Sequence, residues 1–354
     1  MISLRDQISQ MLIMGFSGTT IEDNDSIKNC LRNDGIGGVL LFDYDLQKKC
    51  LGKNLVNATQ IRNLTTELKQ HAQHSVFGKA GIPLFIAVDY EGGAVDRLRH
   101  IEGCMLTKKP AELARLSAAN VQAEANKMAK TLQQLGFNLN FAPVVDLNLN
   151  EEEGIIGKLG RSFSSDPHQT AEIAKIFVEA FAKQGITCCY KHFPGHGSAR
   201  GDTHEGFVDV TDTYHQSELE PYSLLLMDED FPAMIMTAHV INRKLDVSGL
   251  PATLSKTILT NLLRQKLKFD GVIISDDLQM QAISKHYSLE DSLSLTINAG
   301  ADMLIFANQL GEIRAEEIIN KIECLVNSNI IAKKRIEQAY QRIVRLKQAQ
   351  LVLA

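Results

Sequence analysis

The sequence has few cysteines and no long apolar run. Its six cysteines are too sparse for a disulfide framework. None lies in a CxxC pair or in the Cys/His spacing of a zinc site, so we interpret them as buried thiols in a reducing compartment. No window approaches the roughly 18 consecutive apolar residues of a membrane-spanning helix. We therefore expect neither a disulfide-stapled secreted domain nor an integral membrane protein.

A strong charge of either sign is also absent. Acidic and basic residues are interspersed and the formal net charge is −5, so the composition gives no sign of a nucleic-acid or anionic-membrane partner. The segment from Met1 to Gln7 has no basic stretch followed by an apolar one, and we expect no secretory signal peptide and a cytoplasmic location. A periplasmic location is the alternative if a leader was removed.

Linkers, low-complexity tracts and internal repeats are missing as well. Apolar residues make up 44% of the chain and charged residues 22%, which is typical of a globular protein with an ample core. We therefore predict one domain over residues 1–354, and we expect a monomer.

Short apolar runs alternate with longer helical patterns along the whole chain. The runs are nearly continuous in apolar character, as in Leu84 to Val88, which indicates strands buried on both faces of a parallel sheet. They cover residues 11–16, 35–42, 82–89, 137–146, 186–193, 233–240, 271–276 and 301–306. Eight β/α units in series predict an α/β fold, a single (β/α)₈ TIM barrel, which takes about 250 residues and more with insertions. A doubly wound open sheet is disfavoured because neither GxGxxG nor GxxxxGK[ST] follows any run.

The helical patterns have clear ends. Asp166 before Pro167 predicts the start of a helix that Gly185 stops. A second helix is predicted to end at Gly136, and Ser255 is predicted to cap a third. The basic C-terminal segment places apolar side chains on one face, which predicts an outer helix docked on the body with its charged face in solvent. A partner-binding role is the alternative for that face.

The stretch from Lys191 to Gly206 concentrates reactive side chains directly after a predicted strand. Three histidines, a lysine and an aspartate lie there among four glycines and a proline, which suits a loop that presents chemistry better than a core segment. Asp202 and His204 are two residues apart, so the carboxylate can bind one imidazole nitrogen and leave the other for substrate. Such a histidine serves as a general acid near neutral pH.

Polar residues also follow several other predicted strands, and in a barrel those strand ends face one mouth. They are Asp89, Asp146, Lys191, His192, His239, Asp276 and Asp277. Because neighbours on a strand point to opposite faces, we expect only one of the two adjacent aspartates to enter the mouth. A carboxylate opposite a proton donor is the arrangement that retaining glycoside hydrolysis needs.

The chain resembles glycoside hydrolase family 3, in its bacterial β-N-acetylhexosaminidase branch. The matching stretches follow the family's order over nearly the whole chain. They include residues 88–93, 140–146, 160–163, 191–197, 236–239 and 269–278. The stretch from Lys191 to Gly197, together with the downstream Asp-x-His, is the most specific of these matches.

This resemblance implies roles for individual residues. Asp276 is expected to be the covalent nucleophile and His204 the acid/base, oriented by Asp202. The side chains expected to bind the terminal N-acetylglucosamine are Asp89, Arg97, Arg161, Lys191 and His192, with His196 beside them shaping the loop. For Arg97 and Arg161 the alternative is a structural ion pair, and His239 is either a site residue or a satisfied core histidine.

The implied activity is that of a retaining exo-β-N-acetylhexosaminidase on peptidoglycan (muropeptide) fragments, with no metal and no organic cofactor. A phosphorylase on the same scaffold is an alternative, because an imidazole repels an incoming phosphate less than a carboxylate does. A metal-dependent barrel hydrolase would use ligands such as His192, His196, His204, His239 and Asp276, although no H-x-H pair precedes His192. The remaining alternative is an inactive sugar-binding barrel.

Overall fold

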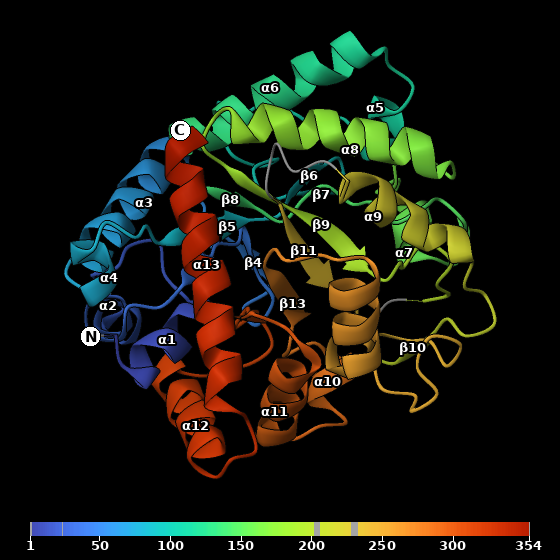
Figure 1. Cartoon of the computed structure of the whole chain (residues 1–354). Helices are drawn as coiled ribbons and strands as arrows, with labels where there is room; N and C mark the ends of the chain where they lie inside the picture. Colours follow the sequence, from blue (N-terminus) through green and yellow to red (C-terminus); the bar gives the residue numbers. More distant parts are fainter. Residues whose placement is uncertain (1, 23, 202–205, 228–232, 354) are drawn as a thin grey trace.

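Eight parallel strands close into a barrel in the computed structural model of the chain, which describes residues 2–22, 24–201, 206–227 and 233–353 (Figure 1). Around the barrel the order is β1-β14-β13-β11-β9-β8-β5-β2. The strands are β1 (Leu12–Gly15), β2 (Gly38–Leu40), β5 (Phe85–Val88), β8 (Leu139–Asn140), β9 (Thr187–Phe193), β11 (Met234–Thr237), β13 (Ile273–Asp277) and β14 (Met303–Phe306). Each predicted apolar run overlaps one of them, so the predicted (β/α)₈ barrel is confirmed.

Three pairs of short strands extend the loops at the C-terminal end of the barrel. They are β3 (Tyr44–Asp45) with β4 (Cys50–Leu51), β6 (Tyr90–Gly92) with β7 (Val95–Asp96), and β10 (Val208–Asp209) with β12 (Val240–Ile241). The first two pairs are antiparallel hairpins that follow β2 and β5. The third joins the loop after β9 to the loop after β11. All three therefore shape the opening toward which the strands point.

Two long amphipathic helices cover the β5, β8 and β9 side of the barrel and pack on each other (Figure 1). Helix α6 (Ala118–Leu135) ends at Gly136, whose φ of 87° is left-handed, as predicted. Helix α8 (Pro167–Ala182) begins after Asp166, whose side chain accepts a hydrogen bond from the backbone N–H of His168. The rings of Phe177 and Phe181 stack at 4.4 Å on its buried face. Both predicted helices are confirmed.

The remaining helices and helical turns connect the strands. They are α1 (Leu4–Gln10), α2 (Asp25–Asn29), η1 (Cys30–Asp34), α3 (Ala58–Ala72), α4 (Val76–Lys79), α5 (Pro110–Leu113), α7 (Ile155–Lys158), η2 (Gln216–Leu219), α9 (Glu220–Leu225), η3 (Ala252–Leu254), η4 (Thr257–Lys266), α10 (Gln281–Ser284), α11 (Leu289–Ala299), α12 (Ala315–Asn327) and α13 (Lys333–Leu353). The helix predicted after Ser255 is η4, which has the wider hydrogen bonding of a π-helix. The Ser255 hydroxyl accepts a hydrogen bond from the backbone N–H of Ile258 at 3.0 Å, as expected of a cap. In the described ranges no helix has the length and apolar character needed to cross a membrane.

Helix α13 lies across the N-terminal end of the barrel. The Lys347 ammonium is fully buried and donates to the backbone carbonyl of Gly37 at 2.7 Å and to the Gln10 side chain at 2.9 Å, just before strands β2 and β1. It also lies 4.8 Å from the ring centroid of Phe85 in β5. Gln350 donates to the Thr187 hydroxyl at the start of β9. The helix therefore closes the end of the barrel opposite the mouth.

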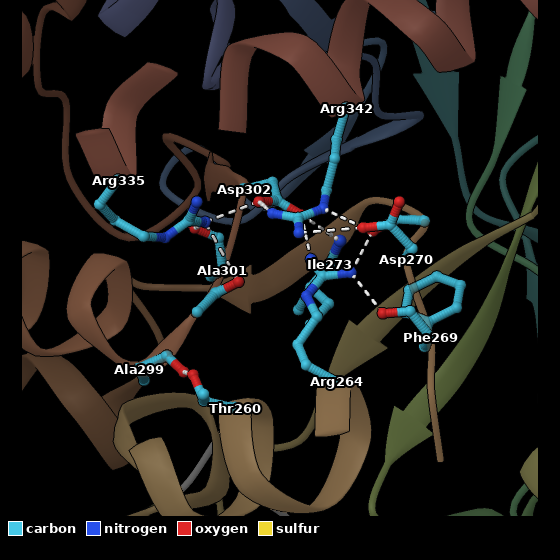
Figure 2. Close-up of polar contacts among 12 residues, drawn as sticks. Thr260, Arg264, Phe269, Asp270, Ile273, Ala299, Ala301, Asp302, Arg335 and Arg342 are labelled. Carbon is cyan, nitrogen blue, oxygen red and sulfur yellow. Dashed lines mark hydrogen bonds and ion pairs between the residues drawn. The ribbon is translucent and has the colours of Figure 1, made fainter. Parts of the chain in front are cut away.

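Half of the six basic side chains of α13, those of Arg335, Arg342 and Lys347, are used for this docking, so the prediction of a solvated charged face is wrong for these three; Lys333, Lys334 and Arg345 are exposed. Figure 2 shows the guanidinium groups of Arg335, Arg342 and Arg264 converging on the fully buried Asp302, which precedes β14. The Arg335–Asp302 contact measures 2.6 Å. Arg342 reaches Asp270 at 3.0 Å as well. Composition could not reveal these partners, because they lie far away in the sequence.

Candidate active site

A cavity of about 220 Å³ opens at the C-terminal end of the barrel strands. Its lining brings together most of the predicted site residues, from the loops after β5 and β8 and from the ends of β9 and β13 with the loop after β9. They are Asp89, Arg97, Arg161, Lys191, His192, His196 and Asp276. Asp202 and His204, which complete the predicted catalytic set, lie outside the described residues.

The deepest polar part of the cavity is an ion cluster centred on Glu91. Arg161 binds this carboxylate with two parallel hydrogen bonds, from Nε at 2.8 Å and from a terminal nitrogen at 2.7 Å. The Lys191 ammonium lies 2.6 Å from the Oε1 atom of Glu91 and 3.1 Å from the Oδ1 atom of Asp89. Both the Glu91 and Lys191 side chains are buried. Two cations and two carboxylates thus hold one another at the mouth of the barrel.

This cluster fixes the charges of its members. Burial alone would raise the pKa of Glu91, but the Arg161 guanidinium and the Lys191 ammonium outweigh burial and hold that pKa well below its ordinary value. Burial alone would lower the pKa of Lys191, but Glu91 and Asp89 raise it above the ordinary value. Both groups are therefore charged at neutral pH, and Lys191 acts as a hydrogen-bond donor only.

Arg97 lies at the outer edge of the same cluster. Its guanidinium is 3.9 Å from the Oδ2 atom of Asp89 and 3.7 Å from the Oδ1 atom of Asp43. The group also lies over the Phe42 ring, 5.6 Å from the centroid. About a third of the Arg97 side chain is exposed, so this arginine faces the opening. Arg161, by contrast, is paired with the buried Glu91. The alternative that Arg161 forms a structural ion pair is therefore correct.

Asp146 organises the two histidines at the end of β9, His192 within the strand and His196 just after it. Its buried carboxylate accepts hydrogen bonds from the backbone N–H groups of His192 at 3.0 Å and His196 at 2.8 Å. The Nδ1 atom of His192 lies 2.7 Å from the Oδ2 atom of Asp146. An ionised carboxylate only accepts, so Nδ1 carries the proton and the Nε2 atom of His192 is left for another partner.

His196 lines the cavity as a neutral imidazole. Burial is the main cause that lowers its pKa, to about 4. Its Nδ1 atom is buried and has no hydrogen-bond partner among the described residues. The ring centroids of His196 and His192 are 5.9 Å apart. The expectation that His196 helps to shape the loop agrees with the binding of its backbone N–H to Asp146.

Glu218 holds the beginning of the predicted catalytic loop. Its buried carboxylate accepts from the backbone N–H of Gly197 at 2.9 Å and from the Ser198 hydroxyl at 2.6 Å. A side chain at Gly197 would lie only 1.9 Å from the carbonyl oxygen of Leu147. Only glycine therefore lets the loop pass so close to the neighbouring segment. Burial raises the pKa of Glu218 above its ordinary value, although the Ser198 hydroxyl opposes the shift.

The described residues on either side of 202–205 are anchored to neighbouring loops. The backbone N–H of Gly201 donates to the carbonyl of Glu153 at 3.1 Å, and the Ala199 carbonyl accepts from the Asn150 side chain. After the undescribed residues, the Phe207 ring stacks on the imidazole of His286 with 3.7 Å between centroids. The loop that follows β8 therefore supports the loop that follows β9.

The expectation that only one of the adjacent aspartates reaches the mouth is wrong, because Asp276 and Asp277 both border the cavity. The pairing of β13 with β14 is irregular here. Ile274 pairs with Met303 and Asp277 with Ile305, so an advance of three residues along β13 matches an advance of two along β14. Such a bulge interrupts the alternation of side chains. The Oδ1 atom of Asp277 accepts from the backbone N–H of Ala307 at 3.1 Å, which ties it to β14.

His239 is a core histidine with both ring nitrogens bonded. Its Nδ1 atom lies 2.8 Å from the Thr253 hydroxyl and its Nε2 atom lies 3.0 Å from the carbonyl oxygen of Asp277. It is fully buried and does not border the cavity. Within the described ranges no three His, Cys, Asp or Glu side chains are grouped as a bound metal ion would require.

Sequence reasoning did not assign a role to Glu91 or Glu218. Glu91 lies inside the stretch 88–93 that carries the resemblance, two residues beyond Asp89. Its partners Arg161 and Lys191 are themselves predicted site residues. The predicted sugar-binding set contains more cations than carboxylates, and this excess was the available sign that a further carboxylate lies among them. Glu218 left no comparable sign, because its partners are backbone N–H groups and a serine.

Comparison with known proteins identifies the class. Residues 3–346 match the glycosyl hydrolase family 3 N terminal domain, and the chain belongs to this family. It is 33% identical over 332 residues to beta-hexosaminidase A of Pseudoalteromonas piscicida, covering 88% of this chain and 53% of that protein. It is 35% identical over 286 residues to the beta-hexosaminidase of Tolumonas auensis, covering 79% of this chain and 78% of that protein.

Solved structures agree with the family. A glycoside hydrolase family 3 beta-N-acetylglucosaminidase from Paenibacillus superimposes with a TM-score of 0.86 at 29% identity, covering 100% of this chain and 64% of that one. LpqI of Mycobacterium tuberculosis gives a TM-score of 0.80 at 27% identity, covering 98% of this chain and 94% of that one. The chain thus spans about half the length of the Pseudoalteromonas relative and just under two thirds of the Paenibacillus chain.

Proposed function

We propose that the protein is a retaining exo-β-N-acetylhexosaminidase that releases terminal N-acetylglucosamine from β-glycosides. The observation that carries this proposal is the cavity itself, in which the Asp276 carboxylate borders the same space as Asp89, Lys191 and His192. Relatives at 33% and 35% identity are named beta-hexosaminidases, which supports the same activity. Peptidoglycan fragments in the cytoplasm are the substrates and location that we propose.

The hydrogen-bonding capacity of the deep wall suits a neutral sugar. The Lys191 ammonium has three donors, and Asp89 and Glu91 accept two of them. One donor is then available to a sugar hydroxyl, while Asp89 accepts from hydroxyl groups and the Nε2 atom of His192 offers a further hydrogen-bonding position. Dense pairing of this kind is needed because a buried polar group left unpaired costs about 1 to 3 kcal/mol.

The proposed reaction has two steps. In the first, the Asp276 carboxylate attacks the anomeric carbon, the bond to the leaving oxygen breaks, and His204 gives that oxygen its proton. In the second, His204 takes a proton from water, the water oxygen bonds to the anomeric carbon, and the ester to Asp276 breaks. Asp202 orients His204 and stabilises its charged form.

Covalent trapping tests this proposal. A 2-acetamido-5-fluoro glycosyl donor should leave a stable label on Asp276, located by peptide mapping. The neighbouring Asp277 provides the control, because its carboxylate accepts backbone hydrogen bonds from Ala307 and Gln279. Label on Asp277, or on any residue other than Asp276, contradicts the mechanism.

Substitution and product analysis complete the test. Asp276→Asn should lower kcat for a nitrophenyl N-acetylglucosaminide by about 10⁴-fold, as loss of a member of a catalytic set does. Added inorganic phosphate should leave free N-acetylglucosamine as the product. If N-acetylglucosamine 1-phosphate forms instead, the chain is a phosphorylase. A higher kcat/KM on a muropeptide disaccharide than on chitobiose would support the proposed substrate.

A further inference from the structure

The cavity has a second wall, which carries no charge. It comes from the ends of β2 and β14 and from the segments that follow them, on the two sides of β1. The side chains that line the cavity from these segments are Leu40, Phe42, Tyr44, Leu46, Ile305, Ala307, Gln309 and Leu310. The ionic wall, from the loops after β5 and β8 and the end of β9, contains Asp89, Arg161 and Lys191. One cavity therefore offers two chemically different surfaces.

Leu46 and Leu310 stand out on the uncharged wall because each is 49% exposed. Among the exposed large apolar side chains of the described residues, these two border the cavity. Leu40 and Ile305 on the same wall are buried already and gain little from a ligand. We name Tyr44, Leu46 and Leu310 the apolar rim.

The apolar rim is held in place by Gln309, which is itself buried. The Oε1 atom of Gln309 accepts from the backbone N–H of Leu46 at 3.2 Å, and its Nε2 atom donates to the carbonyl of Tyr44 at 2.9 Å. Lys53 donates to the same Oε1 atom at 3.2 Å and also to the carbonyl of Asn308. The two loops of the rim are thus joined before any ligand arrives, which lowers the entropic cost of binding to them.

We propose that the apolar rim is the leaving-group subsite and that it selects β-N-acetylglucosaminides whose leaving group presents hydrocarbon beside the scissile oxygen. This inference rests on the proposed function. The buried ionic wall matches the hydroxyls of the terminal sugar, so the rest of the substrate extends toward the opening, where Leu46 and Leu310 lie half exposed. Covering these side chains removes apolar surface from water.

A matched pair of substrates isolates this effect. Hexyl and 2-(2-hydroxyethoxy)ethyl β-N-acetylglucosaminides have leaving groups of the same length, one apolar and one polar. In wild-type protein we expect kcat/KM to be higher for the hexyl compound. Leu46→Ser and Leu310→Ser should each lower the hexyl-to-ether ratio of kcat/KM by about tenfold, the range for a lost apolar contact in a specificity pocket. The difference in intrinsic reactivity between the two alcohols cancels in this comparison.

Three controls separate the subsite from other effects. Leu51→Ser changes an exposed leucine of the same hairpin that does not border the cavity, so the ratio should stay at its wild-type value. Unlike Leu46→Ser, Leu46→Met should keep most of the wild-type ratio, because methionine retains apolar surface at this position. The inhibition constant of free N-acetylglucosamine should be the same in wild-type protein and in both serine variants.

The outcomes distinguish the two proposals. If wild-type protein hydrolyses both glycosides and the serine variants leave the ratio unchanged, the rim is not a leaving-group subsite, while the proposed function stands. If the inhibition constant of N-acetylglucosamine rises tenfold in the serine variants, the rim contacts the terminal sugar and the inference is wrong. If wild-type protein releases N-acetylglucosamine from no glycoside, the proposed function fails, and the subsite fails with it.

Discussion

The ammonium nitrogen of Lys191 lies 2.6 Å from the Oε1 atom of Glu91, beneath the floor of the cavity. Neither side chain reaches bulk solvent, so each charge depends on the other and on Arg161 and Asp89 for compensation. The pair connects the loop after β5 with the end of β9. It therefore positions the groups proposed to bind the sugar and also contributes to the stability of the barrel mouth.

Glu91→Gln should destabilise the protein strongly. The substitution leaves the charges of Lys191 and Arg161 buried and undercompensated, and loss of one partner of a buried ion pair costs about 3 to 5 kcal/mol. Urea unfolding at pH 7 measures the loss. Glu153→Gln is the control, because Glu153 pairs with Arg200 on the exposed surface, where ion pairs contribute little.

The same variant gives a pH test. The pKa of Glu91 is depressed in the folded protein, so its contribution is present above the unfolded pKa of about 4.3 and is lost as the pH falls below that value. The stability difference between wild-type protein and Glu91→Gln should therefore shrink between pH 5 and pH 3, a range set by that reference pKa. A difference that is constant over this range contradicts the assigned charge of Glu91.

Glu218→Gln should lower kcat more than it raises KM. The carboxylate accepts from Gly197, Ser198 and His215, whereas an amide offers one oxygen and a competing donor. The loop that carries the proposed acid/base is then held less well, and we expect kcat to fall about tenfold, since small misplacements of a catalytic group are costly. Glu220→Gln, an exposed change in the same segment, should have wild-type kcat. An increase in KM with an unchanged kcat would contradict this role.

Much of the fold could be predicted because its determinants are local in sequence. Runs such as residues 84–88 are apolar throughout, and Gly136 and Asp166 mark helix ends through their own conformation or side chain. All of the predicted sugar-binding set also lines one cavity, because parallel strands deliver their ends and the residues that follow them to the same end of the barrel.

The errors concern relations between residues that are distant in sequence. The bulge between Ile274 and Asp277 is a property of the register with β14, so strand alternation alone gave the wrong orientation for one aspartate. The partners of Arg335 and Lys347 precede strands β14 and β2. A helical wheel of α13 therefore could not show that these two cations face the barrel. The roles of Asp202 and His204 stay predictions.

Lys347→Met should make the protein more stable near pH 6 and should flatten its stability between pH 7 and pH 10. Burial lowers the pKa of Lys347 to about 7 in the folded protein, from an ordinary value of 10.5. Between these values the unfolded chain holds the proton more than the folded one does, so stability rises with pH, by at most about 1.4 kcal/mol per pH unit. Methionine has a similar shape and removes the titration.

Denaturant unfolding at several pH values measures the slopes of stability against pH. Lys334→Met, a change of an exposed lysine, is the control. Identical slopes of stability against pH in wild-type protein and Lys347→Met would falsify the lowered pKa of this buried lysine.

Phe207 and His286 should act as one unit in positioning the loop after β9. Phe207 follows the undescribed residues 202–205 closely, and its ring stacks on His286 with an interplanar angle of 22°. An aromatic contact of this kind contributes about 0.5 to 1.5 kcal/mol, so Phe207→Ala and His286→Ala should each lower kcat about three- to tenfold with little change in KM. Because both variants remove the same contact, the double variant should be no worse than the more affected single one. His286→Phe retains a stacking ring and should keep most of the wild-type kcat. Additive losses in the double variant, or a loss in His286→Phe equal to that in His286→Ala, would show that the stack does not position the loop.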